Sequence, residues 1–127
     1  MDRYPLGEHG HDINNYPVSK IQTIWENEKK KHSKILLMKI GRFFHLFHQD
    51  ADIFHTEFDL MYMIGKVAIT GFPETQLDKY IDELTKKSYD YHIVLCCHTK
   101  KMEEYQSVLQ DKGYTYSIEK NDLQADL

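Results

Sequence analysis

The sequence has few cysteines and no long apolar run. Its two cysteines, Cys96 and Cys97, are adjacent, so their side chains would point to opposite faces of an extended strand and offer no disulfide framework. We expect both to be small core residues of a protein in a reducing compartment. No apolar run approaches the ~20 residues of a membrane helix, and the N-terminus lacks the apolar segment of a signal peptide. The sequence therefore predicts a soluble, intracellular protein with no membrane partner.

The chain also lacks an overall excess of basic charge. It has 16 basic and 20 acidic residues among 127, a formal net charge of −4, so any contact with nucleic acid must be local. Basic residues do cluster between Lys29 and Arg42, although a solvated helix end is the simpler explanation of such a run. The 41% of apolar residues suffice for one core, and we expect one domain.

Composition divides the chain into three parts. Residues 1–18 contain two of the three prolines and little apolar periodicity, which predicts an irregular N-terminal segment. Residues 19–120 carry the apolar periodicity expected of an α/β domain. Residues 121–127 are predicted to form a polar, acidic tail.

Within the domain, the apolar pattern predicts helices alternating with strands. Helices are expected over residues 19–31, 50–60, 75–87 and 99–112, with Ser19 and Thr75 as N-caps. Strands are expected over residues 35–40, 43–47, 66–70, 91–97 and 114–118, the third stopped by Gly71, Phe72 and Pro73 and the last at a sheet edge. The buried side of the second helix is expected to be Ala51, Phe54, Phe58 and Met61. This order predicts the α/β class, with a mixed β-sheet opened by a β-hairpin and flanked by about four helices.

The first two strands are separated by two residues, which predicts a tight hairpin. A glycine at the first of two loop positions suits a type II′ turn, here Gly41. Pairing of Ile40 with Phe43 across that turn places Phe43 and His45 on one face and Phe44 on the other. We therefore expect Phe44 in the core and Phe43 exposed.

The hairpin sequence resembles a known family. Residues 41–51, Gly-Arg-Phe-Phe-His-Leu-Phe-His-Gln-Asp-Ala, are similar to the N-terminal mismatch-recognition domain of the MutS family, which has a glycine, a charged residue, Phe-x-Glu, a further aromatic and Asp-Ala in that order. Trp25 and Asn27, Gly-Phe-Pro-Glu at residues 71–74, and the helix and strand over residues 77–94 keep the same order. The resemblance is nearer to the eukaryotic mismatch-sensing subunit than to the bacterial form.

In that family the phenylalanine of Phe-x-Glu stacks on a mispaired base from the minor groove, and the glutamate hydrogen-bonds that base. The resemblance implies that Phe43 is this wedge, with Lys39 and Arg42 beside the backbone phosphates. His45 stands in the glutamate position, where it would contact the base with weak or lost mismatch specificity. The implied function is a non-catalytic, DNA-binding module for double-stranded DNA, mismatched or bent, in the nucleus or another DNA-containing compartment, with no cofactor.

A structural or protein-interaction protein that keeps this fold without DNA recognition is the alternative. An exposed Phe43 and an exposed edge strand at residues 114–118 are both adhesive surfaces. They would favour a homo-oligomer or docking on a larger partner protein.

Catalytic functions fit less well. No Gly-x-x-x-x-Gly-Lys-Ser/Thr sequence occurs, so we expect no ATPase. A metal-dependent nuclease needs converging carboxylates and a lysine. The nearest set is Glu57, Asp59 and Lys66, but two residues two apart on a helix point away from each other. We expect no catalytic residues.

The histidines offer a possible metal site in the second helix. His48, Asp52 and His55 have i, i+4 and i+7 spacing and would meet only if that helix starts early. Surface histidines on a helix are the simpler explanation, so no metal is expected.

Overall fold

The structure, a computed structural model, describes residues 3–4, 18–63, 67–96 and 99–119. Within these residues the α-helices are α2 (Val18–Lys31), α3 (His48–Phe58), α4 (Leu77–Lys86) and α5 (Lys100–Lys112), and a short 3₁₀ helix, η2 (Glu74–Gln76), precedes α4. The strands are β1 (Arg3–Tyr4), β2 (Ile35–Ile40), β3 (Phe43–Phe47), β4 (Tyr62–Met63), β5 (Ile69–Pro73), β6 (Tyr91–Leu95) and β7 (Tyr116–Ile118).

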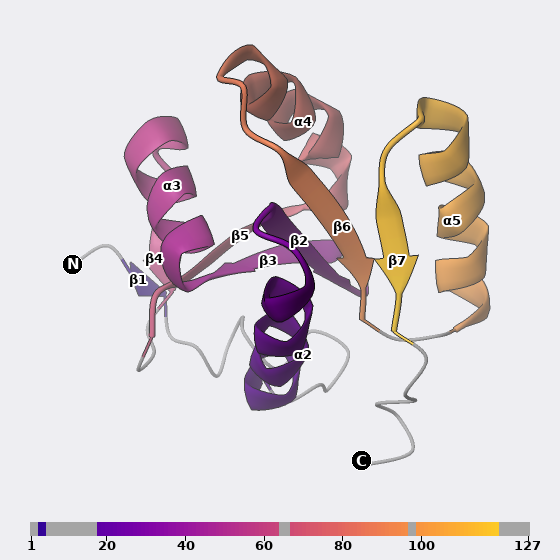
Figure 1. The fold of residues 1–127 in the computed structure, drawn as a ribbon, viewed down its shortest axis with the longest axis horizontal. Coiled ribbons are helices and arrows are strands. Elements are labelled where there is room, and N and C mark those ends of the chain that lie inside the picture. The colour runs from indigo at the N-terminus through magenta and orange to yellow at the C-terminus, as the bar shows by residue number, and fades with distance from the viewer. Residues whose placement is uncertain (1–2, 5–17, 64–66, 97–98, 120–127) are drawn as a thin grey trace.

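Five strands form one sheet in the order β5, β3, β2, β6, β7 (Figure 1). β3 runs antiparallel to both β2 and β5, whereas β6 runs parallel to both β2 and β7. β1 and β4 form a separate parallel pair. The predicted α/β fold, with a mixed sheet opened by the β2–β3 hairpin and flanked by helices, is confirmed.

The helices cover both faces of this sheet. Phe44 stacks on Phe72 with 5.3 Å between ring centroids, and Phe72 in turn contacts Tyr80 of α4 at 4.5 Å. Phe44 also contacts Tyr105 of α5, so α4 and α5 cover the Phe44 face. The last turn of α2 contacts Ser117 of β7 on the opposite face. Figure 1 shows α5 beside the β7 edge and α3 near β4 and β5.

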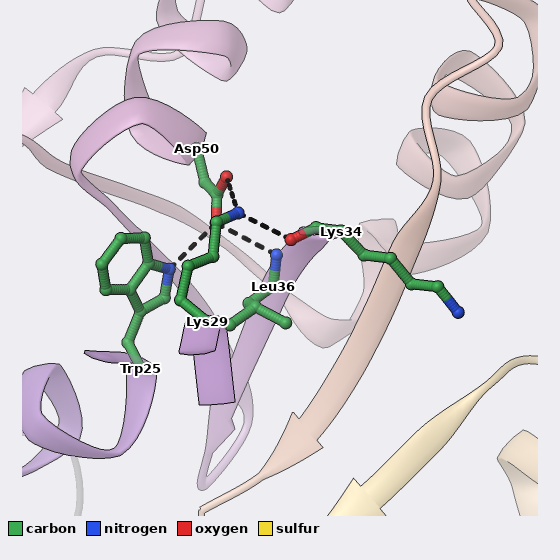
Figure 2. A network of polar contacts seen from close by, with 5 residues as sticks. All are labelled: Trp25, Lys29, Lys34, Leu36 and Asp50. Atoms are coloured by element: carbon green, nitrogen blue, oxygen red, sulfur yellow. Dashed lines mark hydrogen bonds and ion pairs between the residues drawn. The ribbon is translucent and has the colours of Figure 1, made fainter. Parts of the chain in front are cut away.

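The carboxylate of Asp50 joins α2, α3 and β2 (Figure 2). Its Oδ2 atom accepts hydrogen bonds from Trp25 Nε1 at 2.9 Å and from the backbone nitrogen of Leu36 at 3.1 Å. Its Oδ1 atom pairs with Lys29 Nζ at 2.9 Å, and Lys29 also donates to the carbonyl of Lys34 at 2.6 Å. Asp50 is only 1% exposed. A buried carboxylate with three donors therefore fixes α2 against the start of the hairpin.

The predicted strand at residues 66–70 is displaced along the chain. Its observed counterpart is β5, Ile69–Pro73, and residue 66 lies outside the described residues. The Gly-Phe-Pro sequence therefore continues the strand instead of stopping it. A Cβ on Gly71 would lie 2.3 Å from the carbonyl oxygen of Phe44 and 2.5 Å from Phe43 Cε2. The glycine is thus needed so that β5 can lie close to β3 at this point.

Three details of the helices differ from the prediction. Ser19 lies inside α2 instead of ahead of it. Thr75 lies in the 3₁₀ helix η2, and the N-cap position of α4 is occupied by Gln76. Met61, predicted on the buried side of α3, is 44% exposed. The reason is that α3 ends before it, at the left-handed Asp59 with φ 61°.

The segment around α5 follows the prediction. Thr99 caps the helix, since its side chain accepts a hydrogen bond from the backbone nitrogen of Met102 at 3.1 Å. Gly113 ends the helix with a φ of 75°, a conformation that glycine adopts without steric cost. Cys96 is buried, as predicted, whereas Cys97 lies outside the described residues.

The two ends of the chain are described only in part. β7 forms one edge of the sheet, as predicted for residues 114–118. In the segment predicted to be irregular, Arg3–Tyr4 pair with β4, and residues 5–17 lie outside the described residues, as does the predicted tail at 121–127. None of the described helices is long and apolar enough to cross a membrane.

Candidate functional site

The tip of the β2–β3 hairpin is a tight and well-anchored turn. Ile40 pairs with Phe43 across two loop residues, as predicted, and Gly41 has a φ of 55°, the positive value that a type II′ turn needs at its first loop position. The backbone nitrogen of Glu74 donates to the carbonyl of Arg42 at 2.8 Å. The Arg42 side chain itself is exposed. The turn is therefore held by the segment after β5, while its cation remains on the surface.

Lys39 is a buried residue and not an exposed phosphate contact, which corrects the prediction. It is 4% exposed, and its Nζ atom lies 3.1 Å from Glu74 Oε2 and 4.2 Å from the ring centroid of Tyr105. It also donates to the carbonyl of Gly41. The reason is register, because Lys39 pairs with Phe44 and so lies on the face that α4 and α5 cover. The Lys39 ammonium group therefore stabilises the turn from its buried side by joining the Gly41 carbonyl to Glu74.

Phe43 and Phe44 point to opposite faces, as predicted, but Phe43 is half-buried and not fully exposed. Its ring lies beside the backbone of Gly71 and edge-on to the ring of His45, with 5.2 Å between centroids. Phe44 is completely buried. The tip therefore presents one aromatic ring that is partly covered by its own strand neighbours.

His45 is fully buried, so the base contact predicted for it is not available in this conformation. Its ring lies between those of Phe43 and Phe47, with centroid distances of 5.2 Å and 6.3 Å. Neither ring nitrogen has a hydrogen-bond partner within the described part of the chain. Burial lowers the pKa of His45 from 6.5 to about 4. The imidazole is therefore neutral at pH 7, with two unsatisfied polar atoms.

Sequence reasoning missed the residues that support this tip from outside the hairpin. Glu74 neutralises Lys39 and holds the turn backbone, and Gly71 provides room for the Phe43 ring. Both belong to the Gly-Phe-Pro-Glu sequence, of which the first three residues are predicted from sequence to stop a strand. A long-range partner of this kind has no periodic signal, and only the family resemblance pointed to the motif.

Of the three residues that the sequence offered for a nuclease, the structure describes Glu57 and Asp59, and each has a structural role of its own. Glu57 accepts a hydrogen bond from Tyr89 and pairs with Lys87 at 3.0 Å. These two partners hold the pKa of the Glu57 carboxyl below its usual value. Asp59 is the left-handed C-cap of α3, and Lys66 lies outside the described residues.

The histidines considered as ligands in α3 also diverge, although the helix does start early, at His48. The ring of His48 packs on Trp25 with 4.9 Å between centroids. Asp52 accepts a hydrogen bond from Tyr62 Oη at 2.6 Å, and His55 Nδ1 lies 2.8 Å from the carbonyl of Leu60.

Comparisons with known proteins agree with the hairpin motif. The family model of MutS domain I matches residues 19–118. The DNA mismatch repair protein MSH6 of Arabidopsis thaliana is 36% identical over 70 residues, which is 55% of this chain and 5% of that protein. Msh6 of Homo sapiens is 34% identical over 80 residues, 63% of this chain and 6% of that protein.

A bacterial relative covers more of this chain. The DNA mismatch repair protein MutS of Prochlorococcus marinus (strain MIT 9301) is 33% identical over 109 residues, 80% of this chain and 12% of that protein. The chain therefore spans only a small part of the length of each of these relatives.

Proposed function

The chain belongs to the MutS domain I family, and on that premise we propose that it is a non-catalytic module that binds duplex DNA through the tip of the β2–β3 hairpin. The observation that carries the proposal is that a half-buried aromatic residue, Phe43, directly follows an exposed cation, Arg42, on a turn anchored by Glu74. A fixed turn holds the backbone of both residues in place before DNA arrives, so less conformational freedom is lost on binding.

Phe43 is the proposed wedge. An aromatic ring inserted between base steps costs a few kcal/mol of unstacking, and the cost is lowest where pairing is defective or DNA bends easily. The side chain is partly exposed, and its ring contacts His45 and lies beside Gly71. Engaging DNA would therefore require the ring to leave part of its contact with His45.

Arg42 is the proposed phosphate contact, and Lys39 is assigned the separate role of supporting the turn. The Lys39 charge is already balanced by Glu74 at 3.1 Å. With a net charge of −4 and few cations at the tip, we expect binding to be weak unless a partner or a high local concentration supplements it.

Mismatch preference is proposed to be weak or lost. A glutamate in the third motif position offers a charged acceptor, whereas His45 is neutral and enclosed by two phenylalanines. For His45 to reach a base, both it and Phe43 would have to move. Selection would then depend on how easily the DNA deforms, and would favour bent, bulged or mispaired sites only modestly.

The proposal is tested by fluorescence anisotropy with a fully paired duplex, a duplex with a G·T mismatch and a duplex with one unpaired base. The wild type should bind all three, the last two at most severalfold more tightly. Phe43→Ala should weaken binding at least tenfold, whereas Met61→Ala, which removes an exposed apolar side chain away from the tip, should not. Absence of salt-sensitive binding in the wild type, or equal affinities for wild type and Phe43→Ala, would refute the proposal.

Self-association is the second candidate, and the edge position of β7 favours it. Among the residues that the structure describes, this strand is paired on one side only and its side chains are half-buried, so a second copy could add to it. Sedimentation velocity over a range of concentrations tests this directly. A monomer at every concentration would exclude it and leave DNA binding as the candidate.

A further inference from the structure

A cluster of metal-ligating side chains lies away from the hairpin tip, where α2 meets the β6–β7 side of the sheet. Glu28 lies in the last turn of α2, His32 just follows the helix, and His92 belongs to β6. One ligand atom from each of the three residues lies within 4.8 Å of the other two. Three potential ligands from two separate parts of the fold therefore converge on one point.

The cluster is ordered by contacts among its own members. The rings of His32 and His92 are in edge-to-face contact, with 4.8 Å between centroids and an interplanar angle of 88°. The hydroxyl of Ser117 donates to Glu28 Oε1 at 3.2 Å and lies 3.0 Å from His92 Nε2. Ser117 thus links two of the three side chains, as outer hydrogen-bond partners do in metal sites.

Ligand chemistry indicates which ion this set would accept. Two imidazoles and one carboxylate suit Zn²⁺ and other first-row transition ions, whereas Mg²⁺ and Ca²⁺ prefer all-oxygen sites. Around a tetrahedral Zn²⁺ with bonds of about 2.0 Å, neighbouring ligand atoms lie ~3.3 Å apart. The widest separation in the cluster, up to 4.8 Å, would close by ~1.5 Å, which side-chain rotation can supply.

Nearby charges compete but do not block the site. Lys31 Nζ pairs with Glu28 Oε2 at 2.8 Å, but the Lys31 side chain is 71% exposed and can move into solvent. A divalent ion would replace this single positive charge with a stronger one at the same carboxylate. The other carboxylate oxygen already faces Ser117.

We propose that Glu28, His32 and His92 form a binding site for a Zn²⁺-like divalent transition ion, with solvent completing its coordination. The ion would fasten the C-terminal end of α2 to β6 and, through Ser117, to the edge strand β7. The site shares no residue with the hairpin tip, so its role is structural and independent of DNA binding.

The test is a titration of the tag-free full chain with ZnCl₂, followed by long-range ¹H–¹⁵N spectra of the histidine rings and by thermal unfolding. We expect saturation at one equivalent, joint shifts of the His32 and His92 ring signals, and a higher Tm. MgCl₂ at the same concentration should neither shift these ring signals nor raise the Tm. His32→Gln and His92→Gln should weaken Zn²⁺ binding at least tenfold, and Glu28→Gln severalfold.

Matched variants separate this site from the other histidines of the chain. His55→Gln removes a histidine of α3 outside the cluster, and a His9→Gln, His11→Gln double variant removes two near the N-terminus; both should bind Zn²⁺ as the wild type does. His32 lies outside the regular elements, so His32→Gln is the informative variant if His92→Gln does not fold. Unshifted His32 and His92 signals, or wild-type affinity in His32→Gln, would overturn the proposal.

Discussion

The ring of Phe43 lies edge-on against the ring of His45, with 5.2 Å between centroids and an angle of 64° between their planes. The two residues are two apart on β3 and therefore share one face of the sheet. Because His45 is fully buried and Phe43 half-buried, moving Phe43 outward would also uncover His45. The proposed wedge and the residue in the glutamate position are thus coupled through direct contact.

The burial of His45 predicts a pH-dependent stability. Its pKa is about 4 in the folded chain, against 6.5 for the free group. Between these two pH values the unfolded chain binds a proton that the folded chain does not. The contribution of His45 to the free energy of unfolding is therefore fully present above pH 6.5 and is lost as pH falls toward 4. The expected loss is about 3 kcal/mol over that window, at about 1.4 kcal/mol per unit of pKa difference.

This dependence is measured by urea unfolding at several pH values for the wild type and His45→Leu. All other titrating groups are common to both proteins, so the difference between their free energies of unfolding isolates His45. The free energy of unfolding of His45→Leu should rise relative to that of the wild type as pH falls. Parallel pH profiles would show that His45 is not buried in solution.

The two adjacent phenylalanines should differ sharply in their effect on stability. Phe44→Ala removes a completely buried ring and should cost about 3–5 kcal/mol. Phe43→Ala removes a half-buried ring and should cost less, about 1–2 kcal/mol. Urea unfolding of both variants measures this; similar losses would contradict the opposite placement of the two rings.

Asp50 should be among the most sensitive polar positions. Its carboxylate accepts hydrogen bonds from Trp25, Lys29 and the backbone of Leu36. Asp50→Ala would leave the Trp25 and Leu36 donors without an acceptor and Lys29 without its counter-charge, at a cost of about 3–5 kcal/mol. Asp52→Ala, at a carboxylate whose hydrogen bond to Tyr62 is exposed, should cost less than about 1 kcal/mol. Chemical denaturation compares the two.

Gly71 should be intolerant of a methyl group. In Gly71→Ala the added carbon would lie 2.3 Å from the carbonyl oxygen of Phe44, a backbone atom that cannot move away cheaply, so a loss of about 1–3 kcal/mol and a displaced Phe43 ring are expected. Gly113→Ala is the control, since nothing lies within 4 Å there and only the φ of 75° opposes it, at about 1 kcal/mol. Aromatic NMR signals of Phe43 should shift only in the first variant.

The salt dependence of DNA binding should distinguish Arg42 from Lys39. Each lost phosphate contact reduces the slope of log K against log salt by ~0.9, so Arg42→Gln should lower the slope by about that amount. Lys39→Met removes a charge already paired with Glu74 and should leave the slope unchanged while lowering stability. If the slope of log K against log salt is unchanged in Arg42→Gln, Arg42 does not contact a phosphate.

The sequence by itself determined the order of the elements, the hairpin register and the opposite placement of Phe43 and Phe44. These features depend on local chemistry, namely apolar periodicity, a glycine at the first turn position and the alternation of side chains along a strand. The cap and end of α5, at Thr99 and Gly113, were predictable for the same reason.

Only the tertiary structure decided which polar side chains are buried and which of them lie together. The sequence suggests Lys39 and His45 as surface residues of a basic hairpin, yet both are buried. Lys39 lies against Tyr105 of α5 and Glu74, and His45 lies between two phenylalanine rings of its own strand. Likewise, the convergence of Glu28 with His92 on one point has no trace in sequence spacing. The physical reason is that the burial and charge of a side chain depend on which distant segments pack over it, and pairing across the fold sets that packing.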